Sequence, residues 1–550
     1  MKKIANSENI EQFMLKDYIY IDKTKYIYNL IDTYERVFFS RPRRFGKSLT
    51  LNTIGTLFEK GVEPYFKDTW IYDKWNQSSC PVLRLSFLKF SVSDFDKFNK
   101  DFCNEILKFA IANDITDFID AQDPKILIGN IFSAMPEGMQ IVLLIDEYDC
   151  QLTANINNQE LYEKFRIFIR EFYAVLKGEK HIRFMALTGV TRLKDVSIFS
   201  VGSDIKDLSY EHSFSQMIGF TREEIKKFYI DYLKLGISYE KHIETGAVTD
   251  TDVEEFLDRM AEHYDSYCFD EFYENKVFST YSVNNFLQSI FSKQRVIFGE
   301  YWYEAGGIPS ILKNYMEAHD IDLKKFQFSK IEVAYDDFVN PTSLPDMNEN
   351  VLMSQTGYLT LKSDINPNRS KLLLGFANRE VSTALCRLLG LKLFSKTVEI
   401  VTYNNVNLLE TSSTEELIDL FNSVLASVVY DRNSVIHDES SLRAIIQVFM
   451  MGKGVDVRAE QHNFKGRSDI LLNLNKRRIV LELKYSDDGH DVNSLLEGAI
   501  NQIKEKEYGI ENLGDRELIQ IAAVFDGTRE VRKITVFKQI KPRINIKVTL

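Results

Sequence analysis

Cysteine, proline and glycine are all scarce in this sequence of 550 residues. Its five cysteines form no CxxC pair, which argues against a zinc site and a disulfide framework. With only 10 prolines and 25 glycines, long disordered linkers are not expected. No apolar run reaches the roughly 18 residues that a membrane helix needs, and residues 1–7 turn polar too early for a signal peptide. We therefore expect a cytoplasmic protein with no membrane partner.

Positive charge is also in deficit, since the formal net charge is −12. Nonspecific DNA binding depends on phosphate neutralisation, so this balance disfavours a nucleic-acid partner for the chain as a whole. The basic residues are unevenly spread, however. Residues 529–547 hold a single acid, Glu530, among Arg529, Arg532, Lys533, Lys538, Lys541, Arg543 and Lys547. A local basic face can therefore exist on an acidic protein.

Apolar side chains are abundant, because hydrophobic residues make up 44% of the chain and include 39 Phe and 27 Tyr. A chain of this length exceeds what one hydrophobic core usually holds, so we expect two to four domains. We expect most of the aromatic rings to pack in the cores.

A phosphate-binding loop is indicated near the N-terminus. Residues 36–39 form a strand candidate, residues 40–48 contain Gly46-Lys47-Ser48, and apolar residues then recur at helical spacing to residue 58. Backbone N–H groups at a helix start bind phosphate, Lys47 would reach the terminal phosphates and Ser48 would bind Mg²⁺. The first glycine of the usual pattern is missing, since Ser40 and Arg41 stand in its place.

A second element supports ATP binding. Residues 140–147 are an apolar strand that ends in Asp146 and Glu147, as a parallel strand covered on both faces does. Asp146 would hold the Mg²⁺ water shell and Glu147 would polarise the attacking water.

Two further strand candidates, residues 82–87 and 182–187, complete a doubly wound sheet with helices between the strands. Thr188 follows the second and would contact the attacking water or the γ-phosphate. Arg192 could sense the γ-phosphate in cis or in trans, or be a surface arginine. The cofactor-binding residues predicted for ATP are Arg44, Phe45, Gly46, Lys47, Ser48, Asp146 and Thr188.

Near the C-terminus a hairpin carries charged residues in a catalytic pattern. Its strands, residues 466–472 and 477–485, bring Asp469 close to Glu482 and Lys484. The alternation of a strand sends Glu482 and Lys484 to one face and Leu483 to the other. A charged solvent face is the alternative explanation.

Two carboxylates and a lysine can form a hydrolytic site for Mg²⁺ or Mn²⁺. Lys484 would orient the water and stabilise the developing oxyanion, which predicts Glu147, Asp469, Glu482 and Lys484 as catalytic residues. Glu439, at the start of an upstream helix, could complete the carboxylate set, with Glu460 as a competing candidate. The predicted metal ligands are Ser48 and Asp146 in the first site, and Glu439, Asp469 and Glu482 in the second.

From residue 221 the chain is predicted to be mainly helical, with helical apolar spacing over residues 220–235, 253–264 and 283–291. A short hairpin follows, with strands at residues 358–362 and 371–374. We interpret the region as a helical lid followed by a winged-helix-like module, which could bind DNA or only pack between domains.

These motifs together resemble a bacterial family in which an AAA-ATPase-like P-loop domain is fused to a PD-(D/E)XK nuclease-like domain. The resemblance rests on residues 20–24, 41–48, 144–149, 187–190 with 197–200, 355–360 and the C-terminal hairpin. The chain departs from the family at Ser266, where Gly is usual, and in residues 376–381, which lack the usual Pro. Both departures concern local loop geometry.

The resemblance implies ATP and Mg²⁺ binding in the first domain and a restriction-endonuclease-like core in the last. We predict an α/β multidomain protein with an ATPase domain at residues 1–220, a helical and winged-helix-like middle at 221–425 and a nuclease-like domain at 426–550. The leading hypothesis is an ATP-regulated DNA endonuclease, hence an ATPase and a Mg²⁺- or Mn²⁺-dependent phosphodiesterase. The alternative is a nucleotide-switched regulatory or nucleic-acid-binding protein whose nuclease-like domain is inactive.

Several questions stay open at this point. The arginines Arg41, Arg43 and Arg44 could bind phosphate or a neighbouring subunit, and homo-oligomerisation is undecided. No helicase-like motif follows Asp146 and Glu147, which disfavours a motor. The sequence does not distinguish DNA from RNA, or defence, repair and mobile-element roles.

Overall fold

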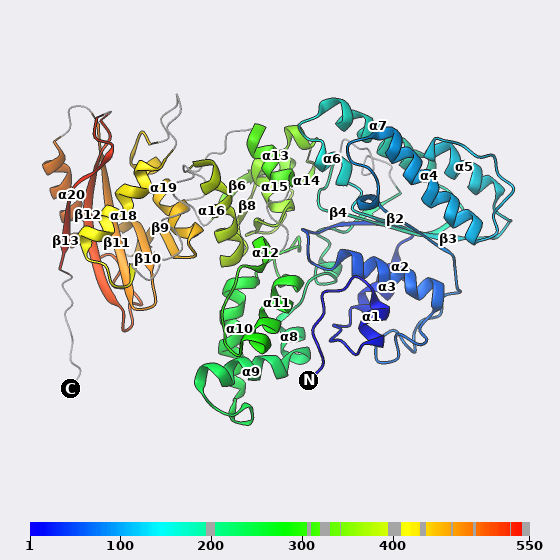
Figure 1. Ribbon diagram of the computed structural model, residues 1–550, viewed down its shortest axis with the longest axis horizontal. Coiled ribbons are helices and arrows are strands. Elements are labelled where there is room, and N and C mark those ends of the chain that lie inside the picture. The colour runs from blue at the N-terminus through cyan, green and yellow to red at the C-terminus, as the bar shows by residue number, and fades with distance from the viewer. Residues whose placement is uncertain are drawn as a thin grey trace. The chain divides into compact units, whose positions relative to one another are not determined.

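The computed structural model describes the chain except for a set of short segments, namely residues 194–203, 305–309, 319–329, 342, 394–408, 429–435, 464–465, 488–490, 529 and 542–550. It divides into two compact units (Figure 1). Unit 1 comprises residues 1–320 and 332–380, and unit 2 comprises residues 321–331 and 381–550. The domain boundaries predicted at residues 220 and 425 stay predictions. No helix among the described residues is long and apolar enough to span a bilayer.

The N-terminal part of unit 1 is a five-stranded parallel sheet in the order β2-β3-β4-β1-β5. The strands are β1 (Arg36–Ser40), β2 (Val82–Ser86), β3 (Ile141–Asp146), β4 (Ile182–Gly189) and β5 (Lys206–Asp207). All of β1 and most of β3 are buried, as strands covered on both faces must be. The predicted parallel-sheet domain is confirmed.

Helices cover both faces of this sheet (Figure 1). On one side lie α1 (Ile10–Leu15), α2 (Thr24–Thr33) and α3 (Lys47–Lys60). On the other side lie α4 (Phe95–Ala112), α5 (Pro124–Ala134), α6 (Cys150–Ala154) and α7 (Gln159–Leu176).

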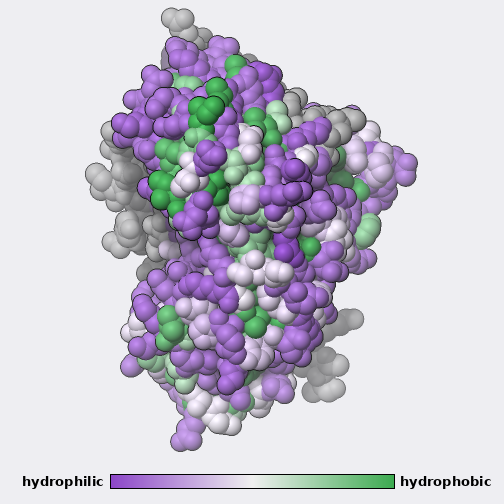
Figure 2. Space-filling model, turned by 90° about the vertical axis from the view of Figure 1, so that its right-hand side faces the viewer, coloured by the Kyte–Doolittle hydropathy of each residue, from purple (hydrophilic) through white to green (hydrophobic). Residues whose placement is uncertain are grey.

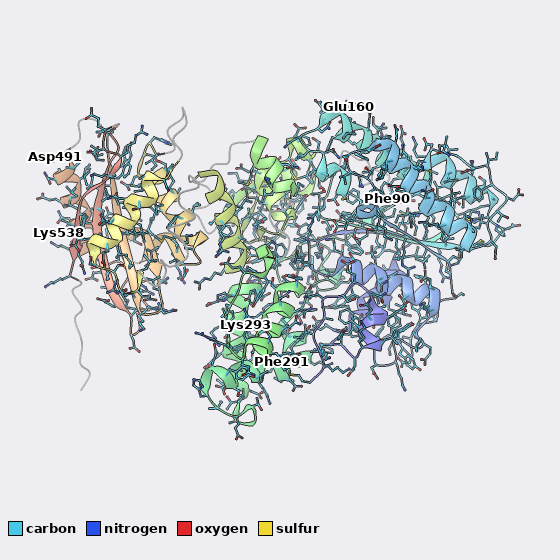
Figure 3. All side chains as sticks on the ribbon, viewed as in Figure 1. Phe90, Glu160, Phe291, Lys293, Asp491 and Lys538 are labelled. Carbon is cyan, nitrogen blue, oxygen red and sulfur yellow. The ribbon has the colours of Figure 1, made fainter. Side chains whose placement is uncertain are left out.

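Phenylalanine rings fill the layer between this sheet and its helices. Phe90, labelled in Figure 3, packs on Phe98 and Phe102 of α4 with ring centroids 5.7 and 4.8 Å away. Phe98 in turn meets Phe168 of α7 at 4.8 Å. These rings account for part of the high aromatic content, as expected from core packing.

The rest of unit 1 is mainly helical, as predicted. Its helices are α8 (Arg222–Phe228), α9 (Ile230–Lys241), α10 (Asp250–Tyr264), α11 (Thr280–Lys293), α12 (Tyr301–Glu304) and α13 (Ser310–Ala318). The helical spacing over residues 220–235 is divided between α8 and α9, because Tyr229 leaves helical geometry at φ −114° and ψ 18°. Its ring is buried, and its hydroxyl donates to Asn284 Oδ1 at 2.5 Å.

A small three-stranded sheet follows, in the order β6-β8-β7. Its elements are β6 (Ile331–Ala334), α14 (Tyr335–Val339), α15 (Glu349–Gln355), β7 (Leu359–Leu361) and β8 (Lys371–Phe376), after which α16 (Arg379–Leu393) begins. The hairpin of β7 and β8 was predicted, whereas β6 was not. The winged-helix-like character of this region stays a prediction.

Unit 2 holds a five-stranded mixed sheet in the order β13-β12-β11-β10-β9, in which only β11 and β12 are parallel. The strands are β9 (Asp456–Asn463), β10 (Gly466–Asn473), β11 (Arg477–Ser486), β12 (Glu517–Asp526) and β13 (Lys533–Ile540), and the helices include α18 (Thr414–Ala426), α19 (Glu439–Gly452) and α20 (Val492–Lys506). This α/β arrangement confirms the predicted fold class.

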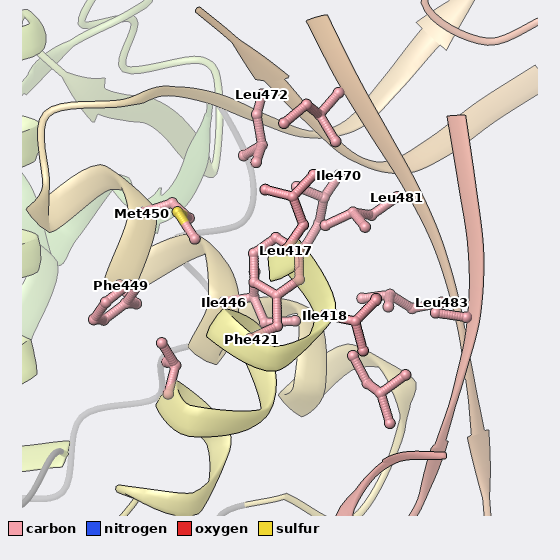
Figure 4. Packing of buried hydrophobic residues seen from close by; sticks show 14 of the residues in the cluster. Leu417, Ile418, Phe421, Ile446, Phe449, Met450, Ile470, Leu472, Leu481 and Leu483 are labelled. Carbon is pink, nitrogen blue, oxygen red and sulfur yellow. The ribbon is translucent and has the colours of Figure 1, made fainter. Parts of the chain in front are cut away.

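The core of unit 2 lies mainly between the sheet and the pair α18 and α19 (Figure 4). Phe421 of α18 and Ile446 of α19 pack against Ile470, Leu481 and Leu483 of the sheet. A second cluster covers the opposite face, where Ile503 of α20 packs with Val480 of β11 and Ala522 of β12. The alternation of β11 thus places Leu483 in the core and leaves Glu482 and Lys484 for the other side of the strand.

Candidate active sites

The loop between β1 and α3 has the geometry of a phosphate-binding loop. Gly46, at the start of α3, takes φ +102°, and Arg44 takes φ +72°. A glycine adopts the left-handed region without strain, so Gly46 lets the loop turn directly into the helix. The first N–H groups of α3 therefore point into the loop, where an anion is favoured.

Four side chains meet beside this loop, from Lys47 and Ser48 at the start of α3, Asp146 at the end of β3 and Thr188 in β4. The Ser48 hydroxyl donates to Asp146 Oδ2 at 2.6 Å, and the Thr188 hydroxyl donates to Asp146 Oδ1. Lys47 Nζ donates to the carbonyls of Arg41 and Pro42 at 3.0 and 3.2 Å. The sheet order explains the meeting, because β4 separates β1 from β3 and delivers Thr188 between the loop and Asp146.

Glu147 lies directly beside the P-loop lysine, with Oε1 3.6 Å from Lys47 Nζ and 9% of the residue exposed. Its backbone takes φ +53°, an uncommon conformation for glutamate. The neighbouring Asp149 is buried and accepts from the N–H groups of Val190 and Thr191 at 3.1 and 2.7 Å. Burial, and then the charge of Glu147, raise the pKa of Asp149.

A pocket of about 580 Å³ opens over the P-loop. Besides residues 43–50 and Glu147, its lining includes residues 5–8 of the N-terminal segment, residues 217–220 and the start of α11. Burial, and then Asp146 and Glu147, raise the pKa of Glu8, which places this carboxylate near the same acids. Sequence reasoning missed Glu8, because no pattern in residues 1–9 relates it to the P-loop.

The arginines of the loop have different surroundings. Arg41 is 1% exposed and donates to the carbonyls of Ser40 and Ser209 at 2.8 and 2.6 Å, and burial lowers its pKa to about 10. Its guanidinium is therefore part of the fold. Arg43 is exposed and lines the pocket, whereas Arg44 stacks on the Tyr281 ring at 4.2 Å. Arg192 donates to Asp207 at 2.9 Å.

Phe45, also predicted to bind the cofactor, has a buried ring. It meets Tyr267, Phe269 and Trp302 edge-on, with centroids 4.8, 5.4 and 5.9 Å away. The residue also lines the pocket. The structure thus gives the side chain an anchoring role, in which it fixes the P-loop to the helical part of unit 1.

In unit 2, Asp469 lies where two strands separate. The pairing of β10 with β11 reaches from Asn473 and Arg478 to Ile470 and Leu481, and Asp469 directly precedes Ile470, just outside the paired residues. Its Oδ2 accepts from the Leu483 N–H at 2.8 Å and its Oδ1 from Arg443 Nη1 at 2.5 Å. The carboxylate is 4% exposed and bridges the diverging strands beside Glu482.

Glu482, Lys484 and Glu439 converge on the same place. Lys484 Nζ lies 3.4 Å from Glu482 Oε1 and 3.6 Å from Glu439 Oε1. Glu482 is fully buried, and among the described residues its Oε2 has no hydrogen-bond partner. The backbone of Glu460 lies in β9, but its side chain is outside the described residues.

Burial and the closeness of the acids to one another raise the pKa values of Glu482 and Glu439. Burial, and then Asp469, raise the pKa of Glu482 to about 8, and the same two causes raise the pKa of Glu439. Burial opposes the charge of Lys484, but Glu482, Asp469 and Glu439 outweigh it and raise its pKa. Each acid would lose its proton more readily beside an added cation.

The fit of a divalent metal can be tested on these contacts. Within the described part of the chain, no three His, Cys, Asp or Glu side chains are gathered closely enough to hold a metal ion. Here Arg443 and Lys484 already neutralise the carboxylates. The unpartnered, buried Oε2 of Glu482 is nevertheless a free oxygen ligand of the kind that Mg²⁺ and Mn²⁺ prefer.

Arg443 was missed by sequence reasoning, although it stands four residues after Glu439 on α19. That spacing places two helix side chains on one face. The spacing therefore relates Arg443 to Glu439 in the sequence. The prediction considered only carboxylates, because an arginine is not a metal ligand.

Comparison with known proteins now adds to this geometry. Residues 6–199 match the family described as "Predicted AAA-ATPase", and residues 438–534 match the "PD-(D/E)XK nuclease superfamily". Matches to an AAA-ATPase-like model and to a PD-(D/E)XK nuclease superfamily model thus occur in one chain. The AAA-ATPase-like match includes the P-loop and Asp146, and its last residues, with the motif at 197–200, lie outside the described part. The nuclease superfamily match includes Glu439, Asp469, Glu482 and Lys484.

A curated relative spans nearly the whole chain. The "Uncharacterized protein in vnfD 5'region" of Azotobacter chroococcum mcd 1 is 26% identical over 535 residues, which is 95% of each protein. The similarity therefore extends through both matched regions and the middle of the chain.

Proposed function

We propose that this protein binds and hydrolyses ATP and is a Mg²⁺- or Mn²⁺-dependent endonuclease acting on DNA, with cleavage regulated by the nucleotide. The observation that carries the proposal is the buried Glu482 with its unpartnered oxygen, beside Asp469 and Lys484. A buried carboxylate oxygen without a hydrogen-bond partner is costly, so a site that keeps one is expected to use it. The family matches support the same reading.

In the C-terminal site, Asp469, Glu482 and Glu439 would hold the metal. When bound, the metal lowers the pKa of a water molecule and neutralises charge at the scissile phosphate. Lys484 would orient the attacking water and stabilise negative charge on the phosphate. Arg443 keeps Asp469 in position through its contact at 2.5 Å.

In the N-terminal site, the N–H groups of the loop and Lys47 would bind the phosphates of ATP. Ser48 and Asp146, already 2.6 Å apart, would hold Mg²⁺. Glu147 would polarise the attacking water, for which it must leave its contact with Lys47. Thr188 fixes the orientation of Asp146.

The decisive experiment measures cleavage of supercoiled and linear DNA by the full chain with Mg²⁺ or Mn²⁺, with and without ATP. Glu482→Gln should abolish cleavage and leave ATP hydrolysis intact, whereas Lys47→Ala should abolish hydrolysis and the response of cleavage to ATP. Glu505→Gln, at an exposed position of α20, is the matched control. Absence of cleavage by the wild type under every metal condition would contradict the proposal.

A second candidate is a nucleotide-switched binding protein whose nuclease-like domain is inactive. The contact of Arg443 with Asp469 favours it, because a guanidinium already neutralises a predicted metal ligand. The net charge of −12 favours a partner other than nucleic acid. DNA binding that is unchanged in Asp469→Ala, without cleavage by either protein, would support this candidate.

A further inference from the structure

Arg443 of α19 makes the closest charged contact in the C-terminal site. Its Nη1 lies 2.5 Å from Asp469 Oδ1 and 4.0 Å from Glu439 Oε1, and the residue is only 8% exposed. A buried arginine is tolerated when it is paired and hydrogen-bonded. The guanidinium therefore belongs to the built structure of the site.

This contact occupies a carboxylate that a metal would need. With Oδ1 bound by Arg443 and Oδ2 bound by the Leu483 N–H, both oxygens of Asp469 have protein partners. Hydrogen bonds between charged groups are stronger than neutral ones. A divalent cation that binds Asp469 must therefore weaken or replace the contact with Arg443, and it also meets the repulsion of that positive charge.

Lys484 does not have the same position. Its Nζ lies 3.4 Å from Glu482 Oε1 and 3.6 Å from Glu439 Oε1, and Glu482 Oε2 has no hydrogen-bond partner among the described residues. The shortest of these contacts is with Asp469 for Arg443 and with Glu482 for Lys484. Arg443 holds Asp469, whereas one oxygen of Glu482 stays open to a ligand.

We propose that Arg443 competes with the divalent metal for Asp469, so that this arginine sets the metal concentration at which the site fills. The inference rests on the proposed function, since it assumes that Asp469 and Glu482 bind a metal. Arg443 is a positioning residue in the metal-free site and an antagonist of metal binding. Removing its charge should therefore increase metal affinity while it disturbs the position of Asp469.

The test measures Mn²⁺ binding to the nucleotide-free full chain by electron paramagnetic resonance of the unbound ion. Binding that Glu482→Gln removes is assigned to the C-terminal site, which separates it from Mn²⁺ held near Ser48 and Asp146. Arg443→Met should bind Mn²⁺ at the assigned site roughly tenfold more tightly, as loss of a competing charged hydrogen bond implies. Arg458→Met, which removes an exposed arginine of the same sheet, should stay within about twofold of the wild type.

Arg443→Lys is the second variant, in case Arg443→Met does not fold by circular dichroism. Lysine keeps the charge but lacks the planar fork of arginine, so its Mn²⁺ affinity should lie between those of the wild type and Arg443→Met. If the wild type binds Mn²⁺ at the assigned site and the folded Arg443 variants bind it equally or more weakly, the inference is overturned. The proposed function would not be affected by that result.

Two other outcomes bear on the proposed function. If neither the wild type nor the Arg443 variants bind Mn²⁺ at the assigned site, both the inference and the metal-dependent nuclease are refuted. If only the Arg443 variants bind, the competition is supported, and the wild-type domain is the inactive one of the second candidate.

Discussion

At the scale of single residues, Asp146 shows how a carboxylate predicted to bind Mg²⁺ is held. It accepts from the hydroxyls of Ser48 and Thr188, one on each oxygen. Ser48 belongs to the loop that would hold the phosphates, and Thr188 belongs to the neighbouring strand β4. A change in either hydroxyl should alter the orientation of Asp146 without removing its charge.

Thr188→Ala should lower the rate of ATP hydrolysis about ten- to a hundredfold, because a hydrogen bond to a charged group contributes roughly 1.5–3 kcal/mol. ATP affinity should change little, since Lys47 and the loop N–H groups are intact. Steady-state phosphate release and equilibrium binding of a fluorescent ATP analogue measure the two quantities. Thr188→Ser, which keeps the hydroxyl, should restore most of the rate. Equal rates in Thr188→Ala and the wild type would remove the role given to this residue.

Ser266 has a backbone conformation that is uncommon for serine. It takes φ +73°, the left-handed region that glycine adopts without strain. The glycine expected here from the resemblance would relieve that strain.

At the scale of elements, the segment of α15 and the β7–β8 hairpin contacts the P-loop within unit 1. Gly357, between α15 and β7, has φ +92°, and a side-chain carbon there would lie 2.8 Å from Pro42 Cβ and 2.9 Å from the Trp302 ring. From the same segment, Gln355 Oε1 accepts from the Arg192 N–H at 3.1 Å. The loop after β1 and the loop after β4 are thus both held by the segment that ends α15.

Gly357→Ala should destabilise unit 1 by roughly 2 kcal/mol or more, from the left-handed backbone and the clash with Pro42. Because Pro42 belongs to the P-loop, ATP affinity should also fall. Gly138→Ala is the matched control, since Gly138 has φ +81° with open space around it. It should show only the backbone cost, about 1–2 kcal/mol, with normal ATP binding. Urea unfolding measures the stability and ATP titration measures the affinity. Normal ATP affinity in Gly357→Ala would contradict a role for the contact with Pro42 in positioning the P-loop.

At the scale of the whole molecule, the net charge of −12 opposes DNA binding, so a DNA-cleaving function needs a local basic face. The face in Figure 2 is mostly hydrophilic, as the 27% of charged residues predicts. Of the basic C-terminal stretch, Lys533 and Lys538 lie on β13 and Lys541 directly after it, and all three are exposed. Lys538 is labelled in Figure 3. Since β13 is an edge strand, its lysines could also prevent pairing with other chains.

Replacing Lys533, Lys538 and Lys541 together by Gln should weaken DNA binding and flatten its salt dependence. Each lost phosphate contact should reduce the slope of log affinity against log salt by about 0.9. A control triple replaces Lys100, Lys108 and Lys164, which are exposed on helices of unit 1. Fluorescence anisotropy of a labelled duplex over a salt series distinguishes them. Equal effects of the two triples would mean that β13 forms no DNA-binding face.

Much of the fold and of both sites could be predicted from local patterns. The apolar strand ending in Asp146, the Gly-Lys-Ser helix start and the alternation that places Glu482 beside Lys484 depend on neighbours in the chain. Their periodicity is fixed by backbone geometry. Strand β6 was missed, because a strand of four residues carries little periodic signal.

The sequence by itself determined which chemical groups are present and which element carries each, since those follow from composition and period. Only the tertiary structure decided how they meet. Phe45 and Arg41 were candidates for the cofactor, but Phe45 packs its ring among Tyr267, Phe269 and Trp302, and Arg41 binds backbone carbonyls. Arg443 reaches Asp469, 26 positions along the chain, only because α19 packs against the sheet. Such partners depend on the packing of distant elements, and no local pattern encodes that packing.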